Sequence, residues 1–359
     1  MLKANNPNKK SSQNISLSEI TNPNAIAQIQ HFRKKEISTS ELVNGILNQN
    51  RTALSRAITL IESTHPTHIE KANSIIKSCL PHVNQSVRIG ITGIPGVGKS
   101  TFIEALGIHL TSLGKKVAVL AVDPSSALSS GSILGDKTRM EELAQDANAF
   151  IRPSPSGSNL GGVARKTRET IILCEATGFD TIIIETVGVG QSEIAVHRMV
   201  DFFLLLQITG AGDDLQGIKR GIMEMADAVI INKADGENSQ NAQVLQAAIQ
   251  KTISLFPKKD SEWVPFVSCC SALHKEGITE IWQTLTSYFE TIKKNHFFEE
   301  NRKNQNLDWM YETINDELLH QFYNQPAIIT QLEINKKAVQ NNEKSPFEAA
   351  LELIRIYKK

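Results

Sequence analysis

The chain has 359 residues, of which 40% are hydrophobic and 21% charged, so it can bury the core of one large domain or two modest ones. Its 38 basic and 38 acidic side chains balance, which argues against a general nucleic-acid or polyanion binder. Apolar runs such as residues 202–206 have the length of buried strands, and none approaches the roughly 20 residues of a membrane span, so no membrane partner is expected.

The N-terminal part is predicted to comprise a tail and a helical extension. Residues 1–24 are rich in Asn, Ser and Lys and lack the apolar core of a secretory signal, so we expect a disordered tail. Residues 25–85 show helical spacing of apolar side chains, with Ser40 as a cap for a helix starting at Glu41. The four cysteines form no Cys-x-x-Cys pair, which favours buried thiols in a cytoplasmic protein.

Residues 86–292 alternate apolar strands with helices, a pattern typical of an α/β fold with a mostly parallel central sheet. The predicted strands are Val87–Thr92, Val117–Val122, Thr181–Glu185, Phe202–Ile208, Ala228–Asn232 and Val264–Val267. The helical pattern returns over residues 293–359. There Ser345 and Pro346 read as the cap and first residue of a last helix, with Glu348 as a capping-box acid.

The strongest motif is a phosphate-binding loop between a strand and a helical stretch that runs from Thr101 to Leu113. It fits G-x-x-x-x-G-K-[ST], in which glycines let backbone N–H groups wrap phosphate oxygens at the start of the helix. Lys99 would reach the β- and γ-phosphates, and the Ser100 hydroxyl would ligate magnesium. The residues assigned to nucleotide binding here are Gly93, Ile94, Pro95, Gly96, Val97, Gly98, Lys99, Ser100 and Thr101.

A second motif selects the base. Asn232, Lys233 and Asp235 follow a predicted strand at the edge where ligands bind in parallel sheets. The Asp235 carboxylate can accept hydrogen bonds from N1–H and the 2-amino group of guanine, a donor pair that adenine lacks. Asn232 and Lys233 would brace the loop. Ser271 and Ala272, after the last predicted strand, match a further guanine-contacting loop, so GTP and GDP are the expected ligands.

The magnesium and switch segments lie between these motifs. Glu185 ends an apolar strand, where a second carboxylate for magnesium belongs, and the Gly188 N–H could sense the γ-phosphate. Asp123, at the end of another strand, is either a magnesium group or a helix cap. Asp136 is either a magnesium group or a solvated loop acid.

The expected hydrolysis is slow. In Ras-like GTPases a glutamine four residues after the switch acid positions the attacking water. Val189 stands at that place here, and Gln191 lies two residues further on. The sequence therefore predicts a GTPase with low activity alone that a partner accelerates.

These segments together resemble the methylmalonyl-CoA mutase-associated GTPases, the family of the bacterial chaperone MeaB, which older annotation calls an arginine/ornithine transport kinase. The similarity runs from about Arg51 to Ala272. The stretches that carry it are residues 51–63, 93–100, 122–126, 131–140, 161–169, 185–193 and 210–221.

The resemblance implies a P-loop GTPase of the SIMIBI class that forms a homodimer through its C-terminal helices. It implies a catalytic set of Lys99, Glu185 and Lys219, with Lys219 responding to the partner. The magnesium shell it implies comprises Ser100, Asp123, Asp136 and Glu185. The implied function is to chaperone an adenosylcobalamin-dependent acyl-CoA mutase, gating cofactor loading and protecting or reactivating the enzyme. Because the chain lacks Asp-x-His-x-x-Gly, the cobalamin would belong to that partner.

Other functions remain open from the residues alone. A GTPase that delivers nickel needs imidazole or thiolate ligands, and here the only close histidine pair is His65 and His68, with a proline between them. A kinase that acts on a transport protein needs a catalytic base distinct from the magnesium acids. A purely structural nucleotide binder would not need Lys99, Ser100 and Glu185 together.

Overall fold

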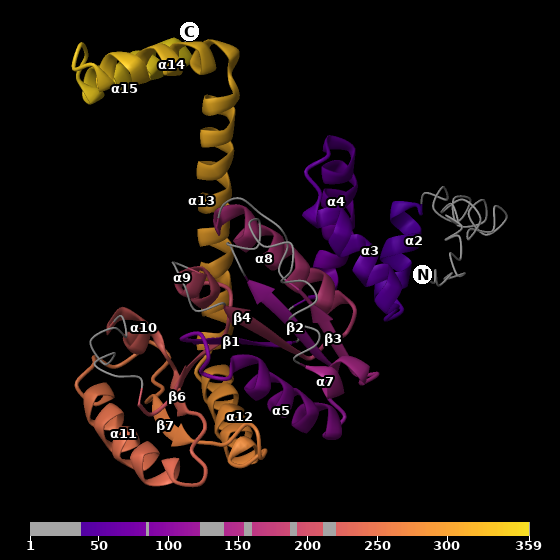
Figure 1. The fold of residues 1–359 in the computed structure, drawn as a ribbon. Coiled ribbons are helices and arrows are strands. Elements are labelled where there is room, and N and C mark those ends of the chain that lie inside the picture. Colours follow the sequence, from indigo (N-terminus) through magenta and orange to yellow (C-terminus); the bar gives the residue numbers. More distant parts are fainter. Residues whose placement is uncertain are drawn as a thin grey trace, which may run out of the picture.

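The structure is a computed structural model that describes residues 37–83, 86–122, 140–153, 160–186, 192–210 and 220–358. A parallel sheet with helices on both faces forms the body, and a long helical arm rises from it (Figure 1). Within the described ranges no helix combines the length and the apolar composition needed to cross a membrane.

The sheet has seven strands, all parallel, in the order β3-β2-β4-β1-β5-β6-β7. The parallel pairing confirms the predicted α/β fold. The strands are β1 Val87–Gly93, β2 Val117–Val122, β3 Ala149–Arg152, β4 Thr181–Thr186, β5 Phe202–Gln207, β6 Ala228–Ile231 and β7 Phe266–Cys269.

Two of these strands differ from the sequence prediction by more than one residue at an end. β3 was not predicted, because its four residues are too short for a clear periodicity. The last strand was predicted at Val264–Val267 and lies two residues later. Val264 is 73% exposed, whereas Val267 is buried, so pairing with β6 begins only where the chain reaches the core.

Alternate residues of the strands bury their side chains against different helices. Ile183 points to the face covered by α5 (Lys99–Ser112) and α12 (Ile278–Lys294), whereas Ile182 and Ile184 point to the opposite face. That second face carries α8 (Leu160–Ala176) and α9 (Ser192–His197). Both faces of the sheet are therefore buried beneath helices, as the uninterrupted apolar strands indicate. The remaining helices of the body are α7 Glu141–Gln145, α10 Arg220–Met225 and α11 Asn238–Ile253.

Within the described residues, three helices precede the sheet and pack beside α8. They are α2 Thr39–Leu47, α3 Arg51–Glu62 and α4 Pro66–Cys79, followed by the short 3-10 turn η2 Leu80–His82. The prediction that Ser40 caps the first helix was wrong. Ser38 is the cap: its Oγ accepts from the Glu41 N–H at 3.2 Å, and the Glu41 carboxylate accepts from the Ser38 N–H at 2.9 Å.

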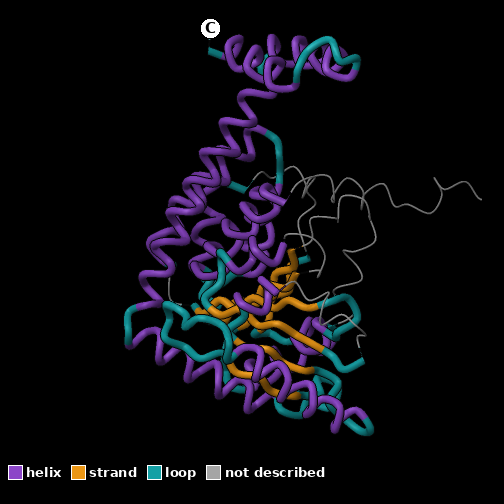
Figure 2. The backbone as a smooth tube through the Cα atoms, turned by 90° about the vertical axis from the view of Figure 1, so that its left-hand side faces the viewer, coloured by secondary structure: helices purple, strands orange, loops and turns teal. Residues whose placement is uncertain are grey.

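The C-terminal arm consists of α13 Phe297–Asn324, α14 Pro326–Gln340 and α15 Pro346–Tyr357. The first half of α13 packs on α12 and α8, while its second half carries the α14–α15 pair away from the body (Figures 1 and 2). Ser345 caps α15, as predicted, by accepting from the Glu348 N–H at 3.2 Å. The division into domains at residues 24, 85 and 292 stays a prediction.

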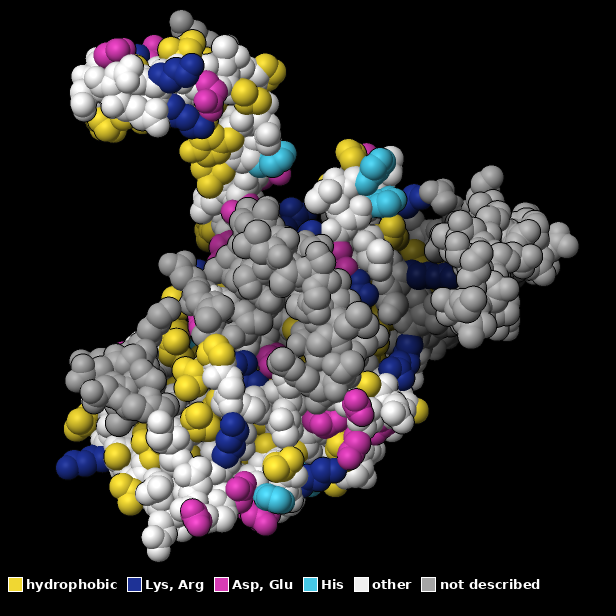
Figure 3. Space-filling view, in the orientation of Figure 1, with side chains coloured by type: hydrophobic (Ala, Val, Ile, Leu, Met, Phe, Trp, Pro, Cys, Tyr) yellow, Lys and Arg dark blue, Asp and Glu magenta, His cyan; other side chains and the backbone are white. Residues whose placement is uncertain are grey.

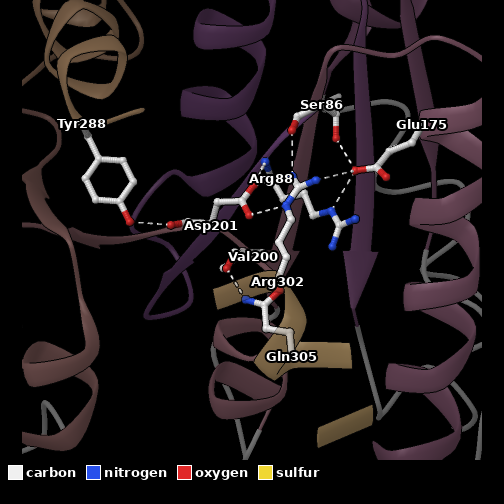
Figure 4. A network of polar contacts seen from close by, with 8 residues as sticks. All are labelled: Ser86, Arg88, Glu175, Val200, Asp201, Tyr288, Arg302 and Gln305. Carbon is white, nitrogen blue, oxygen red and sulfur yellow. Dashed lines mark hydrogen bonds and ion pairs between the residues drawn. The ribbon is translucent and has the colours of Figure 1, made fainter. Parts of the chain in front are cut away.

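A buried polar network fixes the base of the arm (Figure 4). Arg302 of α13 donates to both oxygens of Asp201, at 2.9 and 2.8 Å, and to the carbonyl of Ser86 at 2.7 Å. Glu175 of α8 lies 3.6 Å from the same guanidinium and accepts from Arg88 Nε at 2.9 Å. The arm is thus joined to the end of the sheet at which β1 and β5 begin.

Candidate functional site

The phosphate-binding loop connects the end of β1 to the start of α5, with the geometry that its glycines allow. Gly96 and Gly98 have φ values of +81° and +93°, a region that side chains disfavour. A Cβ atom on Gly98 would lie 2.6 Å from the amide nitrogen of Asn232. The glycine at position 98 is therefore required both by the backbone and by the close approach of the base-recognition loop.

Lys99 is held over this loop and is only 8% exposed. Its ammonium donates to the carbonyls of Gly93 at 2.8 Å and Ile94 at 3.2 Å. Burial lowers the pKa of Lys99, and the carboxylates of Glu185 and Glu193 partly oppose this shift. The ammonium is therefore a donor beside the glycines, where an anionic oxygen can replace the carbonyls as its acceptor.

The proposed magnesium donors Ser100 and Glu185 lie next to this lysine. Ser100 Oγ donates to Glu185 Oε1 at 3.3 Å, although 85 residues separate them in the chain. Thr186 Oγ1, one residue further on, donates to Thr92 Oγ1 at 2.9 Å and so ties β4 to β1 at this edge. A hydroxyl and a carboxylate are the hard oxygen ligands that magnesium takes, so the donor set fits that ion. Four other predicted residues, Asp123, Asp136, Gly188 and Lys219, lie outside the described residues.

The base-recognition loop after β6 is bonded directly to the phosphate loop. Asn232 donates from Nδ2 to the Val97 carbonyl at 2.9 Å, and its Oδ1 accepts from the Ala272 N–H at 3.0 Å. Lys233 donates from Nζ to the Gly96 carbonyl at 2.9 Å. The two sequence motifs, some 130 residues apart, therefore form a single site, with Asn232 buried at its centre.

Asp235 lies at the open side of this loop and is partly exposed. Its Oδ2 accepts a short hydrogen bond from Ser271 Oγ, and the Ala234 N–H donates to the Cys270 carbonyl at 3.0 Å. Ser271 thus orients the Asp235 carboxylate through Oδ2, while Oδ1 makes no hydrogen bond within the described chain. This arrangement suits an acceptor for a planar ring with two adjacent N–H donors.

Sequence reasoning missed Asn238 and Thr209, two residues that support the base loop. Asn238 donates from Nδ2 to the Lys233 carbonyl at 3.1 Å, and its Oδ1 accepts from Thr209 Oγ1 at 2.7 Å. It also missed Glu193, a buried acid of α9 whose charge acts on Lys99. Asn238 and Thr209 belong to no spaced motif, whereas Glu193 ends a stretch that carries the family resemblance but had no role assigned to it.

Comparison with known proteins agrees with this geometry. Residues 54–327 match the family described as "Methylmalonyl Co-A mutase-associated GTPase MeaB". A probable GTPase of Mycobacterium bovis is 46% identical over 315 residues, which cover 88% of this chain and 94% of that protein. The mitochondrial methylmalonic aciduria type A homolog of Mus musculus is 43% identical over 335 residues, covering 90% of this chain and 81% of that protein.

A solved structure described as a LAO/AO transport system kinase has a similar fold. It superposes with a TM-score of 0.72 at 36% sequence identity and covers 89% of this chain and 98% of its own. The family match spans more than half of the chain, and the relatives are well above 30% identical. The chain therefore belongs to the MeaB family of methylmalonyl-CoA mutase-associated GTPases, and its nucleotide is a guanine nucleotide.

Proposed function

From membership of this family and the geometry of the site, we propose that the protein hydrolyses GTP with magnesium to chaperone an adenosylcobalamin-dependent acyl-CoA mutase. Methylmalonyl-CoA mutase is the first candidate client, because it is the enzyme for which the matching family is named. The observation that carries the GTPase assignment is the bonding of Asn232 and Lys233 to the phosphate loop. The GTPase would gate loading of the cofactor and protect or reactivate the mutase.

The residues of the site divide the work on GTP. Backbone N–H groups of the loop bind the β-phosphate, and Lys99 exchanges its two loop carbonyls for β- and γ-phosphate oxygens. Ser100 and Glu185 would hold magnesium, which neutralises charge on those oxygens; Asp123 and Asp136 complete the proposed shell. Lys99→Ala should abolish GTP binding or hydrolysis, and unchanged turnover would remove the phosphate assignment.

We also propose that basal hydrolysis is slow, because Val189 stands where Ras-like GTPases have the glutamine that positions the attacking water. We assign the missing stabilisation of transition-state charge to Lys219, brought to the γ-phosphate when the mutase binds. Lys219→Ala should then spare basal hydrolysis and remove stimulation by the mutase. Equal loss in both assays would place Lys219 in the basal site instead.

The sharpest test of the guanine assignment is Asp235→Asn. The substitution replaces a carboxylate acceptor with an amide that can donate to the 2-carbonyl of xanthine, so preference should move from GTP to xanthosine triphosphate. Asp260→Asn, at an exposed acid outside the site, is the matched control and should leave GTP preferred. If GTP affinity survives Asp235→Asn unaltered, the assignment is wrong.

A homodimer through the arm is the second part of the proposal. A mostly apolar groove of about 760 Å³ lies between the end of α13 and the α14–α15 pair. Its wall includes Leu318, 53% exposed, and Ile354, 42% exposed, and hydrophobic side chains gather on this part of the arm (Figure 3). A second copy of the arm would bury this surface, which a monomer leaves in water.

The dimer can be tested by sedimentation of the full chain. Leu318→Asp should halve the sedimenting mass, because it places a charge in the apolar groove. Leu255→Asp is the matched control, at a leucine 80% exposed on the body, and should not change the mass. A wild-type monomer at working concentrations, or a dimer that survives Leu318→Asp, would refute the arm interface.

We also propose a cytoplasmic location. All four cysteines are free thiols, and Cys79, Cys174 and Cys270 are buried. Burial raises the pKa of Cys79 to about 11 and that of Cys270 to about 12, so these groups stay protonated and unreactive. Free thiols are typical of a reducing compartment such as the cytoplasm, where disulfides are rare.

A further inference from the structure

A second cavity, distant from the nucleotide site, lies where β1 begins. It has a volume of about 320 Å³ and is enclosed by the start of β1, α8, the segment after α9, and α13. Six of its residues define what we call the arginine cavity: Arg88, Arg168, Arg198, Ile171, Met199 and Trp309. Arg88 and Gly93 are five residues apart on one strand, about 17 Å, so this cavity and the phosphate loop are at opposite ends of β1.

Three guanidinium groups face this cavity with most of their N–H groups unused. The Arg88 side chain is 12% exposed, and among the described residues its guanidinium donates only from Nε, to Glu175; its two terminal nitrogens point away from the buried network (Figure 4). Arg168 is 7% exposed and bonds from one terminal nitrogen to Glu312, which also accepts from Arg198 at 2.9 Å. A guanidinium has five N–H donors, so each of the three keeps donors without an acceptor among the described residues.

The charge at the cavity is positive. Among the described residues the wall contains three arginines and no carboxylate; Glu175 and Glu312 pair with these arginines but do not line the cavity. Adding the neighbouring pair of Arg302 and Asp201 gives four guanidinium groups and three carboxylates in total, which leaves one positive charge in excess. An anion is therefore the complementary ligand, and nearly buried guanidinium groups bind anions more strongly than exposed ones.

Apart from Gln305 and Asn306, the other described residues of the wall are apolar. Ile171 and Met199 are at most 2% exposed, and the indole of Trp309 lies beside them on α13. Such a surface contributes affinity only if the ligand carries an apolar or ring-shaped part. A volume of about 320 Å³ is at the small end of ligand sites and excludes a large nucleotide or a folded segment.

We propose that the arginine cavity binds a small organic phosphate. Its phosphate oxygens would accept from Arg88, Arg168 and Arg198, and its apolar or ring-shaped part would lie against Ile171, Met199 and Trp309. Three guanidinium groups that line one cavity from different elements can together donate to the several oxygens of a tetrahedral phosphate, whereas one carboxylate is satisfied by a single guanidinium. The site is independent of the proposed reaction on GTP.

The test is calorimetric titration of the full chain with phenyl phosphate, with GDP and magnesium at saturation so that the phosphate loop is filled. We expect one site per chain. Arg198→Gln should weaken binding of phenyl phosphate and inorganic phosphate by about tenfold or more, because a charged hydrogen bond is lost. Arg198 is half exposed and is the substitution least disruptive to folding; a matched melting temperature and GDP affinity would verify this. Arg56→Gln, at an exposed arginine of α3, is the control and should bind as the wild type does.

A second variant separates the two halves of the site. Trp309→Leu should weaken phenyl phosphate severalfold and leave inorganic phosphate unchanged. Absence of saturable binding, equal affinity in the wild type and Arg198→Gln, or tighter binding of benzoate than of phenyl phosphate would each overturn the proposal. Because GDP affinity is measured in the same samples, failure here is distinguishable from failure of the GTPase assignment.

Discussion

Replacing Arg302 by methionine should detach the base of the arm from the sheet. Arg302 is 5% exposed and makes two hydrogen bonds to Asp201 and one to the Ser86 carbonyl (Figure 4). Its guanidinium also lies 4.3 Å from the centre of the Phe298 ring. Methionine keeps an unbranched chain for packing but leaves the Asp201 charge in a dry site with less compensation.

The size of the effect follows from what Asp201 retains. Removing one partner of a buried ion pair costs about 3–5 kcal/mol, since an uncompensated charge stays behind. Asp201 still accepts from the Arg88 N–H at 2.8 Å, and Glu175 keeps Arg88 and Ser86 as partners. We therefore expect a loss near the lower limit, about 3 kcal/mol in the free energy of unfolding.

Urea unfolding, followed by circular dichroism, measures this loss. The matched control is Lys303→Met, one residue further along α13, where the side chain is 71% exposed and its ammonium lies 3.5 Å from Glu300. This substitution should change stability by less than about 0.5 kcal/mol. Adding Asp201→Asn to Arg302→Met should recover part of the loss, because the stranded charge is gone. A loss below about 1 kcal/mol in Arg302→Met, or no recovery, would refute the reasoning.

Two further predictions concern the nucleotide site and pH. Gly98→Ala should weaken GTP binding by about tenfold or more, because the added Cβ would lie 2.6 Å from the Asn232 amide nitrogen. The control is Gly114→Ala, at a glycine with a similar φ of +79° but open space around it, which should lose stability and keep its GTP affinity. Equal GTP affinity in the two variants would contradict this prediction. Burial alone would raise the pKa of Glu175, but Arg88, Arg302 and Ser86 outweigh it and lower that pKa below 4.5. The Glu175 carboxylate therefore stabilises the fold above its unfolded pKa, and this contribution is lost as the pH falls through the folded pKa. The stability gap between the wild type and Glu175→Gln should accordingly be widest above about pH 5 and narrow below pH 4.5 in urea titrations; a gap that widens in acid would contradict the shift.

The sequence was most informative where chemistry restricts both residue type and spacing. Lys99 and Ser100 follow a glycine loop that requires positive φ angles, and Asn232 to Asp235 follow a buried strand. Parallel strands end at one edge of the sheet, so the two motifs had to approach each other. Their contact through the Val97 and Gly96 carbonyls depends on the fold, and the sequence indicated only their common edge.

Local capping and short strands were less predictable. Ser38 and Ser40 are both suitable caps, and the choice between them depends on whether Glu41 reaches back to the cap residue. β3 has four residues, two of them only partly buried, so it has neither the length nor the alternation that identifies a strand. In both cases the local sequence pattern did not decide the structure, and contacts with other parts of the chain did.

The position of the arm could not be predicted from periodicity at all. The apolar spacing of α13 is weak, and several of its polar side chains bond to partners that lie about 100 to 220 residues earlier in the chain. Arg302, Gln305 and Glu312 appear in the sequence as ordinary residues of a charged helix. Their roles arise only because β1, α8 and β5 place Ser86, Arg168 and Val200 along the same side of α13. Burial of such long-range polar pairs specifies where a helix docks, whereas an apolar stripe specifies only that it docks.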